Sequence, residues 1–361
     1  MIKRIVAVAV GAIFLSGCSM PVPGAGSEKG SIWKSSDSGQ TFAVKSRVDE
    51  KRSIASADVL SLSFHPKDSN RIYIGTVDNG IFRTSDGGEV WEPIDFPPKK
   101  IYSFILDRND PDNRMFASGM LGDVGKIYRT DDGGQNWREV YSEPGTGAVM
   151  TSVAEHPRDT NVLFGGTSAG TMVKSVDGGE TWKNIGAALD GPITQIVFDA
   201  VQPMALYALI HNKQLFYSPD GGMTWIDWEK EKAKDSAAVS NFTSDSGQTA
   251  SRRAPENVLA VIPDPSVSGT IYATKQGGLY RSRDFGKYWD KLNIIESAEK
   301  LPIRAFAVNP HDSNEVVFVA GNAFYKSRNA GETWSVTELA VDRAVSVVAV
   351  SSKNPETIYL A

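Results

Sequence analysis

The sequence predicts an all-β fold in which similar four-stranded units form a closed ring, and three observations carry this prediction. An eight-residue segment, called the box here, occurs seven times; it has Ser or Thr first, Asp or Asn third, Gly fifth and an aromatic residue last. The boxes lie about 45 residues apart, which suits four short strands and their turns. The chain ends with two strand-like segments that lack a box, and it begins with a box that lacks such segments. Six internal units and one unit shared by the two ends therefore predict a seven-bladed β-propeller, closed by pairing of the N- and C-terminal strands.

Each box is predicted to form the turn of a β-hairpin. In the clearest copy, SVDGGETW at Ser175–Trp182, the third-position carboxylate can accept hydrogen bonds from the backbone N–H groups that follow it. Glycine occupies the fifth position in all seven copies, whereas the fourth also accepts Ser, Phe and Ala, so only the fifth is expected to require a positive φ. The last aromatic residue is expected to wedge against the neighbouring unit. The third-position residues, interpreted as structural turn caps and not as metal ligands, are Asp37, Asp86, Asp132, Asp177, Asp220, Asp284 and Asn329.

This pattern resembles the Asp-box, or bacterial neuraminidase repeat. Similar repeats occur in sialidases, sortilin ectodomains, xyloglucanase-type glycosidases and the photosystem II assembly-factor family. The resemblance covers nearly all of the chain after its N-terminal segment, and it implies a β-propeller. It implies no particular activity, because those families share the turn and not the chemistry.

The first residues have the features of an export signal. Lys3 and Arg4 precede an apolar run, Ile5–Leu15, that is too short to span a bilayer. The following Leu-Ser-Gly-Cys resembles a bacterial lipobox, which implies that residues 1–17 are removed and that Cys18 carries a lipid. The alternative is an ordinary signal peptide with an incidental cysteine. We therefore expect an exported protein, lipid-anchored in the bacterial cell envelope at the outer membrane or cell surface, with residues 18–29 as a flexible tether.

Residues 30–361 are predicted to form a single propeller domain. It begins with the box hairpin Gly30–Val44 and ends with strands in Ala344–Val350 and Thr357–Ala361. Because a closed ring has no exposed sheet edge at its seam, pairing of these ends is expected to be a main source of stability. One segment, 230–254, is rich in Lys, Ser, Asp and Ala and lengthens one repeat. It is predicted to be a mobile insertion and not an eighth blade.

Composition excludes several function classes. The chain carries a net charge of −5, which disfavours nucleic acid as a partner. Its single cysteine rules out a disulfide framework and a Cys-x-x-Cys metal or redox site. No cofactor or metal is expected, and contact with the membrane is expected only through the lipid anchor.

Most residues that could suggest anion binding or catalysis have a structural explanation. The position before most boxes is basic, which we interpret as a set of solvent-facing side chains on outer strands and not as an anion-binding ring. Those residues are Lys34, Arg83, Arg129, Lys174, Arg281 and Lys326. His65 and His156 occupy the same place in their repeats, before Pro, and are expected to serve a turn.

The leading hypothesis is a non-catalytic envelope propeller that binds a protein or a glycan. Its binding face is expected among the loops opposite the box turns: Val77–Gly80, Met120–Gly125, Thr167–Gly170, His211–Lys213, Lys275–Gly277, Ser46–Asp58 and Asp95–Lys100. Arg304 and Arg343, near the starts of inner strands, are expected to reach the central channel.

The alternative is a glycoside hydrolase that acts on exported polysaccharide with a carboxylate pair on the same loops. Such enzymes need two carboxylates across a cleft, for which Asp78 and Asp123 are weak candidates, as is Glu143. Xyloglucanase-type enzymes normally have two propellers, and the chain lacks the Arg-Ile-Pro segment usual in sialidases. A cleft with two facing carboxylates would favour the hydrolase, and a flat or apolar face would favour the binding protein.

Overall fold

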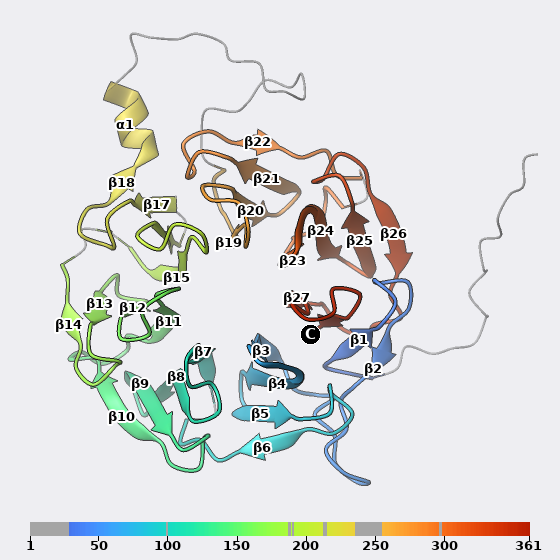
Figure 1. Ribbon diagram of the computed structural model, residues 1–361, viewed down its shortest axis with the longest axis horizontal. Coiled ribbons are helices and arrows are strands. Elements are labelled where there is room, and N and C mark those ends of the chain that lie inside the picture. The colour runs from blue at the N-terminus through green and yellow to red at the C-terminus, as the bar shows by residue number, and fades with distance from the viewer. Residues whose placement is uncertain are drawn as a thin grey trace, which may run out of the picture.

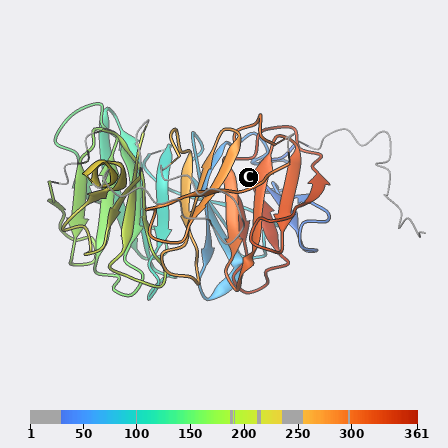
Figure 2. The same cartoon turned by 90° about the horizontal axis from the view of Figure 1, so that it is seen from above.

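The computed structural model describes residues 29–98, 100–186, 189, 191–211, 215–234, 255–295 and 298–361. The expectations for the signal segment, for Cys18 and for most of the tether lie outside the described residues. Seven four-stranded antiparallel sheets surround a central axis, which confirms the seven-bladed β-propeller (Figure 1). Seen edge-on, the ring is a flat disc whose strands run through its thickness (Figure 2).

Six blades follow the chain order from the inner to the outer strand. Blade 1 is β3 (Val59–His65), β4 (Asp68–Thr76), β5 (Ile81–Thr84) and β6 (Glu92–Ile94). Blade 2 is β7 (Ile101–Leu106), β8 (Arg114–Leu121), β9 (Val124–Asp131) and β10 (Arg138–Ser142). Blade 3 is β11 (Met150–Glu155), β12 (Leu163–Thr167), β13 (Met172–Ser175) and β14 (Lys183–Asn184).

The second half of the ring repeats this plan. Blade 4 is β15 (Ile193–Phe198), β16 (Leu206–Ile210), β17 (Leu215–Ser218) and β18 (Ile226–Asp227). Blade 5 is β19 (Ala260–Pro263), β20 (Ile271–Lys275), β21 (Gly278–Ser282) and β22 (Asp290–Lys291). Blade 6 is β23 (Ala305–Asn309), β24 (Asp312–Ala320), β25 (Ala323–Ser327) and β26 (Ser335–Glu338).

Blade 7 joins the two ends of the chain, as predicted. Its strands, from inside outward, are β27 (Val348–Val350), β28 (Ile358–Leu360), β1 (Trp33–Ser35) and β2 (Ala43–Val44). The pairing of β1 with β28 places Trp33 opposite Leu360 and Ser35 opposite Ile358. Every residue of β28 is buried, so the seam of the ring is packed like the other blades.

The hydrophobic core lies between neighbouring blades. Second strands such as β16 are buried at every position, because each blade is covered on both faces by its neighbours. The box aromatic residues fill these junctions, as expected: Trp91 of blade 1 is fully buried and donates from Nε1 to the Lys45 carbonyl beside blade 7 at 2.7 Å. Phe42 of blade 7 packs edge-to-face on Phe324 of blade 6, with ring centroids 5.3 Å apart.

The box turns confirm the capping role of the third position. Asp177 accepts hydrogen bonds from the Ser175 hydroxyl at 2.8 Å and from both the backbone N–H and the hydroxyl of Thr181 at 2.9 and 2.5 Å. These bonds stabilise the carboxylate and lower the pKa of Asp177 to about 2. Asn329 makes the corresponding bond with the Thr333 N–H at 2.9 Å, so that turn survives the change from Asp.

The expectation that only the fifth position has a positive φ is wrong. The fourth position is also left-handed, with φ of 62° at Ser38, 60° at Phe285 and 54° at Ala330. In the box of blade 3 the two positions differ in the space around them: a Cβ at the fifth-position Gly179 would lie 2.4 Å from a ring carbon of Phe116 on blade 2, whereas a Cβ at Gly178 would meet nothing closer than 3.5 Å. A side chain at Gly178 therefore costs only backbone strain, whereas a Cβ at the fourth-position Gly133 would also lie 3.0 Å from the Asp112 carbonyl oxygen.

Part of the predicted insertion is ordered. Residues 230–234 belong to helix α1 (Trp228–Lys234), and 235–254 lie outside the described residues. Asp227 caps the helix by accepting hydrogen bonds from the N–H groups of Glu229 and Lys230, and Trp228 donates from Nε1 to the Phe285 carbonyl of blade 5 at 3.0 Å. Among the described residues, no helix is long and apolar enough to cross a membrane.

Candidate functional site

The ring has two faces with different roles. Because consecutive strands of a blade are antiparallel, its turns alternate between the two faces. The box turns and the inner turns, which join the first and second strands, form the box face. The hairpins between second and third strands and the links between blades form the loop face.

The inner turns contain a second repeated cap that sequence reasoning found only in part. The residue at the end of each inner strand accepts a hydrogen bond from the backbone N–H two residues later. These residues are His65, Asp107, His156, Asp199, Asp264, Asn309 and Ser351. The turn role predicted for the two histidines is confirmed, and burial lowers the pKa of both. The sequence signal for this cap is a His, Asp, Asn or Ser residue at the same place in every repeat, because each of these side chains can accept a hydrogen bond from the backbone.

Contacts between successive inner turns run around the whole ring. Each of the seven blade junctions is crossed by at least one hydrogen bond between inner turns. The bonds are Lys67 Nζ to the Asn109 carbonyl, Arg108 N to Glu155, Arg158 to the Val201 carbonyl, Gly269 N to Asp199, Ser313 Oγ to Asp264, His311 to the Ser352 carbonyl, and Lys353 Nζ to the Lys67 carbonyl. The polar groups at the inner edge of the box face are therefore used to hold the blades together.

The basic residues before the boxes form an outer set of such links, so their prediction as solvent-facing side chains is wrong for most of them. Arg129 is only 5% exposed and donates to the Gly178 carbonyl, at the fourth position of the next box, at 2.7 Å. The same link joins Lys34 to Gly87, Lys174 to Gly221, Arg281 to Ala330 and Lys326 to Ser38. Arg83 instead pairs with Glu92 on its own blade. The left-handed fourth position turns its carbonyl toward the preceding blade, where a long cation reaches it.

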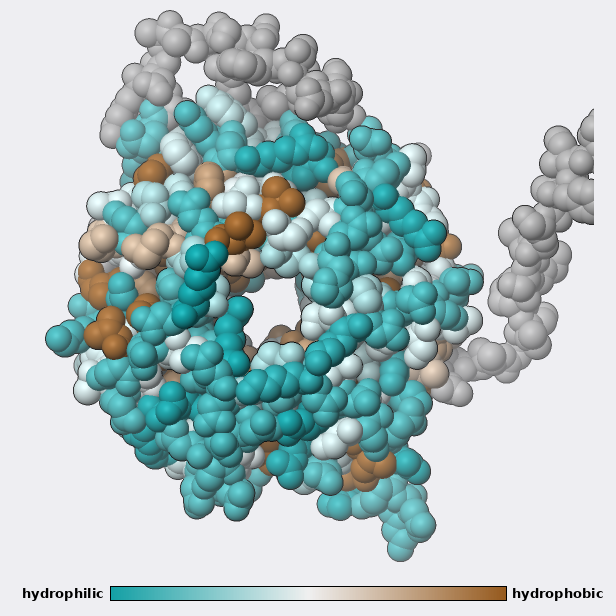
Figure 3. Space-filling model, viewed as in Figure 1, coloured by the Kyte–Doolittle hydropathy of each residue, from teal (hydrophilic) through white to brown (hydrophobic). Residues whose placement is uncertain are grey.

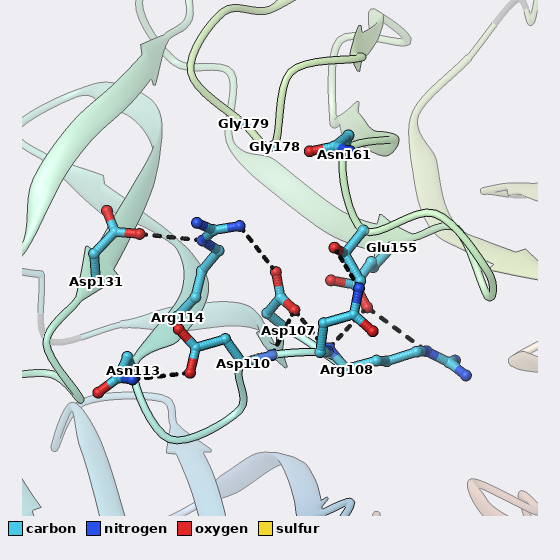
Figure 4. A network of polar contacts seen from close by, with 12 residues as sticks. Asp107, Arg108, Asp110, Asn113, Arg114, Asp131, Glu155, Asn161, Gly178 and Gly179 are labelled. Atoms are coloured by element: carbon cyan, nitrogen blue, oxygen red, sulfur yellow. Dashed lines mark hydrogen bonds and ion pairs between the residues drawn. The ribbon is translucent and has the colours of Figure 1, made fainter.

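The box face also contains a pair of buried carboxyl groups, at the junction of blades 2 and 3 (Figure 4). Asp107 accepts hydrogen bonds from the N–H groups of Asn109 and Asp110 and from Arg114. Glu155 accepts one from the N–H of Arg108 at 3.2 Å through Oε2, while its buried Oε1 has no partner. Burial, and then the charge of Asp107, raise the pKa of Glu155 to about 7.

This pair is not a hydrolytic site. The side chain of Asp107 is fully buried and that of Glu155 is 4% exposed, so no glycan can reach either group. Glu155, the carboxyl group with the raised pKa, therefore lies buried between two blades. We expect its protonation to change the stability of the fold and not to take part in catalysis.

Replacing Glu155 with Gln is expected to abolish one component of the pH dependence of folding. Because its pKa is raised from 4.5 to about 7, Glu155 stays protonated to a higher pH in the folded state than in the unfolded state. The parent therefore loses stability as pH rises from about 4.5 to about 7, by about 3 kcal/mol from this group. The measurement is urea unfolding of parent and variant at several pH values. The exposed Glu332→Gln variant is the control, and a stability difference between parent and E155Q that is constant with pH would contradict the prediction.

The candidate catalytic carboxylates lie on two separate hairpins of the loop face. Asp78 lies in the β4–β5 hairpin of blade 1 and Asp123 in the β8–β9 hairpin of blade 2, both exposed. Within the described part of the chain neither side chain has a hydrogen-bond or ion-pair partner. Glu143 instead accepts a hydrogen bond from the Tyr141 hydroxyl at 2.8 Å. No group of three His, Cys, Asp or Glu in the described residues could hold a metal ion.

Arg304 and Arg343, which were expected to reach the central channel, have different surroundings. Arg343 does not extend freely into the channel, because it donates to the Ala57 carbonyl at 2.8 Å and pairs with Asp58 at 3.2 Å, joining blade 7 to blade 1. Arg304 is exposed at the start of the inner strand of blade 6. The channel itself is open, and most of its rim is hydrophilic in the view of Figure 3.

The two faces expose different kinds of apolar side chain. Every exposed leucine and isoleucine among the described residues belongs to the loop face: Leu60, Leu121, Leu259, Ile295 and Leu301. Leu60 and Leu259, at 42% and 44% exposure, stand at the starts of two inner strands, beside the mouth of the channel. The exposed large apolar residues of the box face are valine, methionine and tyrosine in turns, such as Val176 and Met223.

Comparison with known sequences places this chain among β-propellers. The family model described as the DUF6242 beta propeller domain matches residues 110–340. The xyloglucanase Xgh74A of Acetivibrio thermocellus is 26% identical over 61% of this chain, which spans only 24% of that protein. The photosystem II stability/assembly factor HCF136 of Arabidopsis thaliana is 21% identical over 81% of this chain and 70% of that protein.

Solved structures share the fold at lower identity. The Niastella koreensis GH74 enzyme has a TM-score of 0.64 at 16% identity, over 84% of this chain and 51% of that one. YCF48 from Cyanidioschyzon merolae has a TM-score of 0.59 at 18% identity, over 84% and 95% of the two chains. A structure of YCF48 bound to D1 peptide has a TM-score of 0.60 at 16% identity, over 84% and 91%. At these identities the likeness shows the fold alone.

Proposed function

Because this chain belongs to the DUF6242 beta propeller domain family, whose fold it shares with enzymes and with a peptide-binding protein, we propose from its own surface that it is a non-catalytic binding propeller. The loop face holds a protein partner. The observation that carries this proposal is the collection of all exposed leucine and isoleucine side chains on that face. The large aliphatic side chains that this face exposes give a partner apolar area to bury, whereas the polar groups at the inner edge of the box face are occupied by links between blades.

Placement at the envelope is the second part of the proposal. The N-terminal segment, whose Leu-Ser-Gly-Cys resembles a bacterial lipobox, would anchor the ring through Cys18. A tether of residues 18–29 reaches at most about 40 Å from the membrane, at about 3.3 Å per residue. Because Gly30 enters β1 from the loop face, the tether would turn this face toward the bilayer. The partner would then be an envelope protein held close to the membrane.

Capture of an envelope partner tests the binding surface. We expect purified protein to retain a partner from solubilised envelope, and Leu60→Ser together with Leu259→Ser to lower the retained amount about tenfold or more, since buried anchors contribute most of the binding energy at interfaces. Val176→Ser, which changes an exposed apolar residue of the box face, is the matched control. Equal capture by both variants would contradict a loop-face site.

Glycoside hydrolysis is the second candidate, favoured by the likeness to xyloglucanases. It is tested by release of reducing sugars from a glycan panel with the parent and with the double variant Asp78→Ala, Asp123→Ala. We expect no turnover with either protein. Turnover by the parent that disappears in the double variant would replace the binding assignment with an enzymatic one.

A further inference from the structure

One sector of the loop face, at blades 5 and 6, has a fixed framework. The link that follows β22 crosses this face and is bound to the β20–β21 hairpin: Gly277 N donates to the Leu301 carbonyl at 3.0 Å, and Ile303 N donates to the Lys275 carbonyl at 3.3 Å. Gly277 has φ +69°, and a Cβ there would lie 2.1 Å from the Glu299 carbonyl oxygen. Only glycine allows the link to approach so closely, so the side chains of this sector are held at defined positions.

Two leucines form the apolar part of the sector. Leu259, just before β19, donates its N–H to the Thr274 carbonyl at 2.8 Å and therefore lies beside Lys275. Leu301 is 36% exposed, and its Cδ1 lies against the β24–β25 hairpin at Gly321, where a Cβ would be 2.8 Å away. Both leucines are thus hydrogen-bonded through their backbones to blade 5, Leu259 to Thr274 of β20 and Leu301 to Gly277 of the hairpin.

Three cations of the same hairpin and link have no carboxylate partner among the described residues. Lys275, Lys300 and Arg304 take part in no ion pair with any described residue, and the adjacent Glu299 is paired with Lys291 at 2.9 Å. Arg343, near the start of the next inner strand, shows the opposite case, because Asp58 neutralises it. In a chain with a net charge of −5, three unpaired cations beside exposed leucines give this sector a local positive potential.

We infer that this sector, defined by Leu259, Lys275, Lys300, Leu301 and Arg304, binds an acidic peptide segment of the partner protein. Carboxylates of the segment pair with the two lysines and the arginine, which provide charge-assisted hydrogen bonds. An apolar side chain of the segment packs between the two leucines and excludes water from those pairs. The inference rests on the proposed function and assigns the chemistry of the partner.

The test is fluorescence anisotropy with the full chain and a labelled peptide that combines Asp, Glu and Leu. We expect Lys300→Glu with Arg304→Glu to weaken binding about 10- to 100-fold, and higher salt to weaken binding to the parent. Lys183→Glu with Arg283→Glu, an equal charge change outside the sector, is the control. Leu259→Ser with Leu301→Ser should also weaken binding, and equal unfolding midpoints of all variants establish that each one is folded.

Several outcomes would overturn the inference. A peptide with Asn and Gln in place of Asp and Glu should not bind, and equal affinity for it would exclude charge recognition. Binding to phosphatidylglycerol vesicles but not to the peptide would assign the sector to a lipid surface. If K300E/R304E still captures an envelope partner that the Leu60 and Leu259 variant loses, the proposed function stands and the acidic-peptide assignment is wrong. If neither the parent nor any variant captures a partner, the proposed function fails as well.

Discussion

Removal of Thr357–Ala361 is expected to abolish cooperative folding of the entire ring and not merely to shorten one sheet. The deletion eliminates β28, whose Ile358, Tyr359 and Leu360 are at most 1% exposed. It also removes the Tyr359 hydroxyl bond to the Gly87 carbonyl of blade 1 at 3.0 Å. Burial of three large side chains contributes about 5 to 9 kcal/mol, which is comparable to the total stability of a typical domain.

Urea unfolding followed by near-ultraviolet circular dichroism measures this effect. The truncated chain should show no cooperative transition, or one at a much lower urea concentration than the parent. Glu356→Ala, an exposed position just before β28, should unfold like the parent. A truncated protein that unfolds in one transition at the parent's midpoint would show that the seam adds nothing to stability.

Gly179→Val is expected to destabilise the ring strongly through a single box turn. The new side chain must adopt φ near +82°, and its Cβ would lie 2.4 Å from a ring carbon of Phe116 on blade 2. Backbone strain contributes about 1 to 3 kcal/mol, and the overpacked junction adds about 1 to 3 kcal/mol. We expect a loss of about 2 to 6 kcal/mol in the free energy of unfolding, measured by urea titration.

Two milder variants separate strain from overpacking. Gly178→Ala meets no atom within 3.5 Å and should cost about 1 kcal/mol from backbone strain alone. Ser36→Ala, exposed at the second position of the first box, should cost about 0.5 kcal/mol or less. If G178A were as destabilising as G179V, the contact with Phe116 would have no special importance.

Local repetition explains why the sequence predicts the architecture. A box turn is determined within eight residues: Ser175, Asp177 and Thr181 bond one another directly, so seven copies signal seven similar hairpins. The incomplete units at the two ends then predict the composition of blade 7, because the two strands from each end of the chain together make one four-stranded blade. Helix α1 could also have been found, since Asp227 caps a run of Glu, Lys and Ala that favours a helix.

Contacts between blades are what the sequence pattern does not reveal. The sequence pattern predicts that Arg129 faces solvent, because it alternates with buried residues along an outer strand. In the structure it is buried against the next blade, where it donates a hydrogen bond to the Gly178 carbonyl. The same limit applies to Glu155, whose pKa is raised by burial between two blades and then by the charge of Asp107 in the other blade. The exposed leucines of the loop face were missed because link residues such as Leu301 have no regular period, so their exposure follows only from how the link crosses the hairpin.

The position of β1 determines how the molecule bears mechanical load. This strand receives the N-terminal segment and lies between β28 and β2, in the interior of the blade 7 sheet. A pull through the residues before it acts along the strand direction, so the backbone hydrogen bonds to both neighbours are sheared together and do not open one after another. Under the proposed anchoring, such a pull would act on both ends of the chain at once, because one sheet contains the first and the last strands of the ring.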